Sequence, residues 1–468
     1  MNTPVTHPAA PDAWRTLRWT CTAVFMALLD ATILFVAFPS VRRSFPAVSA
    51  ADLSWILNAY TVVYAALLVP AGRIADRIGR RRVFLRGVGL FTLGSVACGI
   101  APTPWFIVAG RVIQAAGGAM LTPSSLALVL SAFPRPKWPV AVSLWAAVGA
   151  LAAAVGPGLG AALIQLGGWR WAFFINLPVG AAVLARGRVA LVDSRDAQAE
   201  GDVDVIGIVL LIVAIGLSAL GLVKAHDWGT ANAALCIGLS AALLGAFVLR
   251  EGRVQTPALD LSLFHAASFR YTNAATLVFG GAFSAMFFGS VLFLTNVWGY
   301  DTAHAGLALT PGPLVVLVVA PLAGRLAGRL GHRLLLTSGG GIFGLGFFLR
   351  YLATSTTPHY LSEWLPAMVL SGIGVGLVLP SLTSAAAHNL PAHRFAVGSA
   401  VNQAIRQIGS VLGVSVAVAL VGSSRGADSL SSFLSLFLCL AVAGWGTALL
   451  SAAIDLRPAV VEAPSHVA

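Results

Sequence analysis

The residue best suited to chemistry is an acid that lies deep within the first long apolar stretch. Asp30 has apolar neighbours on both sides, and no other Asp or Glu lies so far inside such a stretch. An ionised carboxylate at the centre of a membrane-spanning helix costs about 2.5–3.5 kcal/mol. A carboxyl group that alternates between a dry environment and water or a cation takes up and releases a proton. The sequence therefore predicts a proton-coupling role for Asp30, with a static ion pair between helices as the alternative.

Arg111 is the predicted partner of Asp30, because it is a second charge inside an apolar stretch. Each residue stands about seven or eight positions from the same boundary of the membrane, which places both roughly 10 to 12 Å below it. Gln114 follows Arg111 at i+3 and shares its helix face. We therefore expect Asp30 and Arg111 to pair, and the pair to break or reorganise during function, with Gln114 as a candidate cavity residue.

A polar stripe marks the apolar stretch near 396–421. Asn402, Gln403 and Arg406 lie on it at close to helical spacing. Such a stripe avoids lipid, and it either lines an aqueous cavity or bonds a neighbouring helix. We expect Asn402 and Gln403 to bond a neighbour and Arg406 to serve a cavity or a gate. All three are candidate cavity residues.

The apolar stretch near 138–165 contains several glycines at close to helical spacing. Gly149, Gly156 and Gly160 share one helical face, and Pro157, followed by Gly158, interrupts the backbone hydrogen-bond ladder. Small residues let two helices approach closely, and proline removes a backbone hydrogen bond so that the helix can bend. Ordinary small-residue packing is the simplest explanation of this face.

A basic loop between two apolar stretches occurs twice in the chain. The first copy contains Gly72, Arg73, Asp76, Arg77, Gly79 and Arg80, and the second is the similar run 324–331, with Gly328 in place of the acid. Basic residues next to membrane spans set orientation, which explains the arginines but not Asp76. Because the two copies take matching places in the topology, we interpret them as an internal duplication, with chance similarity as the alternative.

The elements that position these residues must be membrane-spanning helices. Of 468 residues 58% are hydrophobic and 10% are charged, with a mean hydropathy of +0.86. A chain this apolar is an integral membrane protein, and its short loops leave no room for a soluble catalytic or nucleotide-binding domain. The net charge of +12 serves membrane orientation rather than nucleic-acid binding. The four cysteines and nine histidines form no metal-ligand spacing, so no metal site is expected.

Fourteen apolar runs are long enough to cross a bilayer. The predicted spans are 17–38, 54–72, 83–101, 104–131, 138–165, 172–191, 205–223, 231–249, 271–297, 304–324, 333–353, 363–387, 396–421 and 431–455. The basic residues concentrate in the loops on the side that holds both termini, so we expect that side to be cytoplasmic. Arg350 is assigned to the opposite side.

Duplication of six-span halves leaves two extra spans, which gives an all-α, 6 + 2 + 6 arrangement of fourteen transmembrane helices. The predicted regions are a cytoplasmic tail (1–16), an N-terminal six-helix bundle (17–191), a loop with two inserted helices (192–260), a C-terminal six-helix bundle (261–455) and a second cytoplasmic tail (456–468).

Several motifs together resemble the major facilitator superfamily, and in particular its fourteen-span drug:proton antiporter branch. They are Leu29-Asp30-Ala31-Thr32-Ile33 in the first span, the loop that begins at Gly72, Arg111-Val112-Ile113-Gln114 in the fourth span, Gly156-Pro157-Gly158-Leu159-Gly160 in the fifth, and Trp169 to Pro178 after it. One position departs from the pattern, because Ala115 stands where the family usually has glycine.

The resemblance implies a major facilitator fold and a secondary active transporter, not an enzyme. It implies export of hydrophobic or cationic drugs or antibiotics in exchange for protons across a bacterial plasma membrane, by one chain, with no cofactor. It also implies that Asp76 locks the cytoplasmic gate and that the glycine motif of the fifth span limits leak. A dedicated exporter of one metabolite or antibiotic is the main alternative, and a non-transporting sensor is less favoured.

Overall fold

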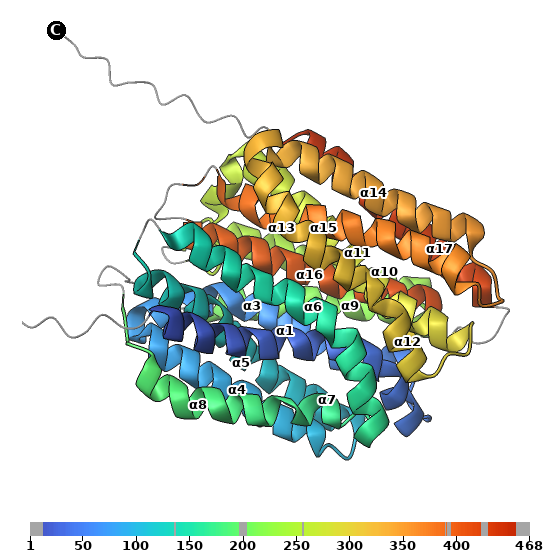
Figure 1. The fold of residues 1–468 in the computed structure, drawn as a ribbon, viewed down its shortest axis with the longest axis horizontal. Coiled ribbons are helices and arrows are strands. Elements are labelled where there is room, and N and C mark those ends of the chain that lie inside the picture. Colours follow the sequence, from blue (N-terminus) through green and yellow to red (C-terminus); the bar gives the residue numbers. More distant parts are fainter. Residues whose placement is uncertain are drawn as a thin grey trace, which may run out of the picture.

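The computed structural model describes residues 13–134, 137–195, 204–254, 257–388, 390, 395–422 and 429–454. In this part of the chain all regular secondary structure is helical, and fourteen stretches are long and apolar enough to cross a membrane. Figure 1 shows the helices side by side with their long axes in about the same direction. The chain is therefore a helical multi-pass membrane protein, as the composition predicts.

The first part of the chain forms six long helices and two single turns. They are α1 (Ala13–Ser44), α2 (Ala50–Leu53), α3 (Trp55–Ile78), α4 (Arg80–Gly99), α5 (Pro104–Ala132), α6 (Trp138–Gly167), α7 (Trp171–Phe174) and α8 (Asn176–Ala190). Helix α1 packs against α5, α6 and α8, and α4 packs against α5 and α8. Asp30 on α1 is therefore surrounded by helices of this group.

Two helices follow, α9 (Val205–Val223) and α10 (Ala225–Glu251), and they pack against each other. Only α9 also makes an extensive contact with the remaining helices, on α3 and α16. This placement is compatible with two inserted spans between two sets of six, and the domain boundaries given above stay predictions.

The last part of the chain forms the second set. It contains η2 (Leu261–His265), α11 (Ala267–Asn296), α12 (Thr302–Leu309), α13 (Pro311–Leu330), α14 (His332–Ala353), η3 (Tyr360–Trp364), α15 (Leu365–His388), α16 (Phe395–Val421) and α17 (Leu430–Ala452). Its contacts with the first set run mainly through α3 against α16 and through α6 against α12 and α13.

Each predicted span coincides with one of the fourteen stretches. The two basic segments that the sequence analysis treats as loops are helical instead. Gly72 to Ile78 complete α3 and Arg80 begins α4, so Gly79 alone separates the helices. Gly331 separates α13 from α14 in the same way. Both glycines have positive φ, +119° and +78°, a conformation that residues with a side chain rarely adopt. The repeat is thus a helix–glycine–helix corner.

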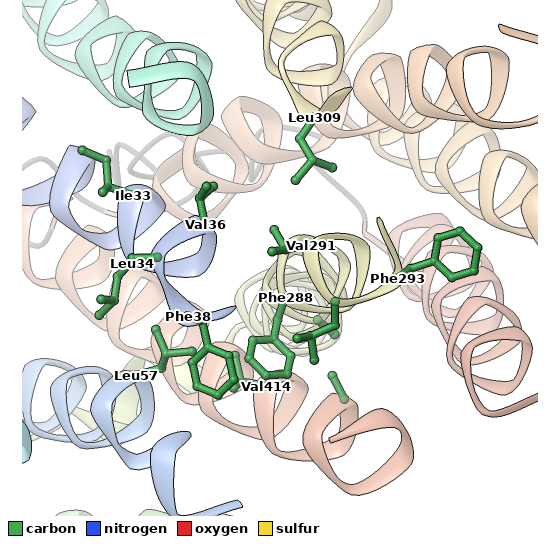
Figure 2. Packing of buried hydrophobic residues seen from close by; sticks show 14 of the residues in the cluster. Ile33, Leu34, Val36, Phe38, Leu57, Phe288, Val291, Phe293, Leu309 and Val414 are labelled. Atoms are coloured by element: carbon green, nitrogen blue, oxygen red, sulfur yellow. The ribbon is translucent and has the colours of Figure 1, made fainter. Parts of the chain in front are cut away.

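On the side of the membrane away from the chain termini the two sets of helices close against each other. Figure 2 shows this apolar layer, in which Phe38 of α1 and Phe288 of α11 meet edge to face with ring centroids 4.9 Å apart. Nearer the helix ends, Arg43 donates a hydrogen bond to the Thr302 hydroxyl at 3.0 Å. The two helix sets are therefore in direct contact on the far side.

Candidate functional site

The Asp30 carboxylate lies in the interior of the first helix set and is fully hydrogen-bonded. Its exposed fraction is 2%. Oδ2 accepts from Nη1 of Arg111 at 2.5 Å, and Oδ1 accepts from the Gln114 amide at 3.2 Å and from the Asn176 amide at 2.7 Å. The charge of a buried carboxylate is tolerated when it is paired and its remaining lone pairs are satisfied, and both conditions are met here.

Arg111 connects α5 with α1 and α3. Besides Asp30, its guanidinium donates through Nε to the Ile56 carbonyl at 3.1 Å and through Nη1 to the Gln114 side-chain oxygen at 2.9 Å. The guanidinium carbon also lies 4.0 Å from the centre of the Tyr60 ring, a cation–π distance. The cation therefore has partners in three directions.

A second layer holds the amides that bind Asp30. The hydroxyl of Ser95 on α4 accepts hydrogen bonds from the amides of Gln114 (2.8 Å) and Asn176 (3.1 Å) and donates its own to the Phe91 carbonyl. Gly94 makes room for this layer, because a Cβ there would lie 2.6 Å from the Gln114 side chain. The network thus joins α1, α3, α4, α5 and α8.

The predicted pair of Asp30 and Arg111 is formed, and the equal depth of the two residues was a sufficient signal. Sequence reasoning assigned no role to Asn176, Ser95 or the Tyr60 ring. Asn176 lies in the Trp169 to Pro178 motif, which was the available signal for it. Ser95 is an ordinary small polar residue within an apolar run, and nothing in the sequence distinguishes it.

The glycine face of α6 lies against α1 next to this network. A Cβ at Gly156 would lie 2.1 Å from the Thr32 hydroxyl, and one at Gly160 would lie 3.2 Å from Ile33. Gly149 lies opposite Leu28, on the other side of Asp30 along α1. The close packing predicted for this face is confirmed, and its partner is the helix that carries Asp30.

The same segment of α6 reaches the second helix set. Gly306 of α12 lies so close that a Cβ there would be 2.8 Å from the Pro157 carbonyl oxygen, and Gly158 faces Thr310. The run from Gly156 to Gly158 is therefore held between α1 on one side and α12 on the other.

The polar stripe of α16 contacts neighbouring helices. Asn402 is buried and donates to the side-chain oxygen of Asn273 on α11 at 3.0 Å, as predicted for a residue that bonds a neighbour. Gln403 and Arg406 are half-buried and lie within interaction range of Tyr64 on α3. Gln114 has no exposed surface in this structure, whereas Gln403 and Arg406 keep some.

Comparison with known proteins gives the family. A sequence model described as the Major Facilitator Superfamily matches residues 20–414. The chain belongs to the major facilitator superfamily, a family of transporters. A solved structure, the crystal structure of the human organic anion transporter MFSD10 (TETRAN), has the same fold, with a TM-score of 0.67 at 14% identity, covering 94% of this chain and 100% of that one.

Superfamily relatives of this chain include resistance proteins. The chain is 35% identical over 404 residues to the multidrug resistance protein Stp of Mycobacterium tuberculosis, which covers 86% of this chain and 74% of that protein. It is 34% identical over 423 residues to the tetracenomycin C resistance and export protein of Streptomyces glaucescens, which covers 88% and 77%.

The basic segment that begins at Gly72 lies at the corner between α3 and α4. The Asp76 carboxylate accepts from Nε of Arg80 at 2.8 Å, so its ion pair in this structure spans the Gly79 corner. The Arg73 guanidinium donates to the Pro257 carbonyl, in the segment that follows α10. Gly72 packs against Pro123 of α5, and Arg77 lies in the last turn of α3.

A second carboxylate at this corner, Asp193, lies at the N-terminus of α4. Oδ1 of Asp193 accepts from the Arg81 amide at 3.1 Å, and Oδ2 lies 3.4 Å from Nε of Arg82. A helix N-terminus favours a negative charge, and in this structure Asp193 supplies it. Asp193 lies in the segment after α8, which the sequence does not connect to this corner.

Arg350, counted above among the basic residues of the far side, is a second buried cation. It lies within α14 with 1% of its surface exposed, and its guanidinium carbon is 3.8 Å from the centre of the Trp364 ring. The Trp364 ring reaches Arg350 from η3, a short π-helical turn whose last residues begin the predicted span 363–387.

Proposed function

We propose that this protein exports hydrophobic or cationic drugs or antibiotics from a bacterial cell in exchange for protons. It acts as one chain in the plasma membrane with both termini in the cytoplasm, and it needs the proton gradient but no cofactor. The observation that carries the proposal is the buried Asp30–Arg111 pair, a neutral unit that one proton can convert into a charged one.

Protonation of Asp30 removes the counter-ion of Arg111 while the guanidinium stays buried. A buried charge without its partner is strongly unfavourable, so the network must rearrange or open to water. Movement of α1 at Thr32 is transmitted to α6, because Gly156 leaves no space between them. The close contact of Pro157 with Gly306 then passes the movement to α12 and the second helix set.

Two relatives support drugs or antibiotics as the substrate class, since one is named for multidrug resistance and one for tetracenomycin C resistance and export. The second name favours the alternative of a dedicated exporter of a single antibiotic. Among the cavity candidates, Gln403 and Arg406 are best placed to meet a substrate, because their side chains keep some exposed surface, whereas Gln114 and Asn402 are buried.

Transport of a lipophilic cation such as ethidium in inside-out vesicles tests the proposal. We expect gradient-dependent uptake by the native chain and its loss in Asp30→Asn. Asp301→Asn is the matched control, because Asp301 is an exposed helix cap outside the network. Retention of gradient-dependent uptake in Asp30→Asn would exclude proton coupling through this residue. If the native chain moves no lipophilic cation but moves a single antibiotic, the dedicated exporter is correct.

A further inference from the structure

Two buried carboxyl groups meet where the two inserted helices come together, on the side of the membrane that holds the chain termini. Asp204 precedes the first turn of α9, and Glu251 is the last residue of α10. Their exposed fractions are 7% and 4%. Neither residue belongs to the Asp30 network.

One oxygen of each carboxyl group is held by donors. Oδ1 of Asp204 accepts from the Gly207 amide at 3.0 Å and from Nη2 of Arg250 at 2.9 Å. Oε2 of Glu251 accepts from the Leu259 amide at 2.7 Å. These contacts fix the orientation of both groups.

The other two oxygens face each other. Oδ2 of Asp204 and Oε1 of Glu251 are buried and have no hydrogen-bond donor among the described residues. Both point to the same place, because a Cβ on Gly207 would lie 2.6 Å from the first and 2.5 Å from the second. Two buried acceptors in this position repel each other unless a hydrogen lies between them.

The surrounding charges leave the second carboxyl group without a full counter-ion. Arg250 pairs with Asp204, Arg73 on α3 is shared with the nearby Asp260, and the one charged residue of α16, Arg406, faces Tyr64. Burial acts to raise the pKa of Asp204, but hydrogen bonds from Arg250 and from the Gly207 amide bring that pKa below its usual range. Asp204 is therefore the ionised member, and the proton belongs on Glu251.

We propose that Asp204 and Glu251 form an acid–carboxylate pair that binds one proton and so clamps the inserted helices to the segment before η2. That segment links Glu251 to the last part of α3, because the Leu259 amide donates to Glu251 and the Pro257 carbonyl accepts from Arg73. Loss of the proton places two negative charges side by side and loosens the contact. The two inserted helices thereby gain a function, a proton-sensitive link to the basic segment that is separate from Asp30.

Infrared spectroscopy of the whole protein in lipid tests the proton directly. The chain has four glutamates, Glu200, Glu251, Glu363 and Glu462, so isotope labelling of glutamate carboxyls is selective. An unperturbed glutamate has a pKa of about 4.3 and is ionised at neutral pH. We expect a protonated carboxylic-acid carbonyl band at neutral pH that shifts on glutamate labelling and disappears in Glu251→Gln. Asp30 cannot produce this glutamate-sensitive band, and its absence from the native protein overturns the proposal.

Thermal unfolding of the same protein tests the clamp. The folded pair holds a proton that the unfolded chain releases, so the native melting temperature falls as pH rises from mildly acidic to mildly alkaline. Glu251→Gln places an amide donor opposite Asp204 at every pH and should flatten this fall. Glu363→Gln, in η3, is the matched control and should keep the native dependence of melting temperature on pH.

Parallel pH profiles for the native protein and Glu251→Gln would overturn the clamp. If Glu251→Gln does not fold, the isotope shift in the native protein still decides whether the proton is present. A native protein that lacks the band but is stabilised by sodium or magnesium ions would assign the carboxyl pair to a cation, and this result also overturns the proposal.

Discussion

Two arginines, Arg111 and Arg350, are buried to the same extent, one in each helix set, but their surroundings differ. Arg111 has a carboxylate at 2.5 Å and a backbone carbonyl and a side-chain amide oxygen within 3.1 Å. Arg350 donates only to the Ser290 hydroxyl at 3.3 Å, and its Nε and Nη2 have no acceptor among the described residues. Aromatic rings take the place of the carboxylate.

The difference separates a site that can be switched from one that cannot. A proton on Asp30 changes the net charge next to Arg111, whereas the rings of Phe347, Trp364 and Phe437 around Arg350 do not titrate. Cation–π contacts stabilise a desolvated cation by about 2 kcal/mol or more with no charge to neutralise. We infer that the first cation serves a changing state and the second a constant one.

The largest expected effect comes from removal of the switchable cation. Arg111→Met leaves the Asp30 charge buried without its partner, and breaking a buried pair in this way costs about 3–5 kcal/mol. The double variant Asp30→Asn/Arg111→Met should recover most of this loss of stability but not proton-driven transport. Thermal or denaturant unfolding in detergent measures the first effect and vesicle transport the second. An unchanged unfolding midpoint in Arg111→Met would contradict the buried pair.

A smaller loss of stability is expected when Asn176 of α8, whose amide binds Asp30, is replaced. Asn176→Ala removes the 2.7 Å hydrogen bond to Asp30, and a hydrogen bond to a charged group contributes about 1.5–3 kcal/mol. Unfolding experiments should show a loss of stability in this range. Asn232→Ala on exposed α10, whose amide bonds only its own helix, is the control.

Much of this architecture follows from one-dimensional signals. About 20 apolar residues suffice to identify a span, so all fourteen were placed correctly. Depth along a helix is also one-dimensional, and it was enough to pair Asp30 with Arg111. Arg350 shows the limit of that reasoning: it stands three residues before the end of α14, where an arginine usually reaches water, and only the packing of Trp364 reveals that it is buried.

The contacts that the sequence did not predict join segments with no common pattern. Asn176 of α8 binds Asp30, and Ser95 of α4 binds Asn176 and Gln114. Asp204 and Glu251 stand at opposite ends of the two inserted spans, and a hairpin of two spans brings such ends together. The topology alone therefore predicts that Asp204 and Glu251 lie near each other. Only the structure shows that both carboxyl groups are buried.

A substitution at the contact between α1 and α6 is expected to cost nearly as much stability as Asn176→Ala. Gly156→Ala places a methyl group 2.1 Å from the Thr32 hydroxyl, and overpacking of this kind costs about 1–3 kcal/mol. Transport should fall further than stability, because this contact links the Asp30 helix to the second helix set. Gly238→Ala on α10 is the matched control, since a Cβ there meets nothing within 4 Å. Equal transport by the two variants would show that the glycine face of α6 does not link Asp30 to the second helix set.

The smallest effect on stability and transport is expected when Arg350 is replaced. Arg350→Met removes a cation–π contact but also removes a buried charge with unpaired donors, and replacement of buried charges by apolar side chains is often close to neutral. We expect a change in unfolding free energy of no more than about 1 kcal/mol, with proton-driven transport retained at native pH dependence. A loss as large as that of Arg111→Met would mean that Arg350 also has an anionic partner in the folded protein, and the contrast between the two helix sets would then disappear.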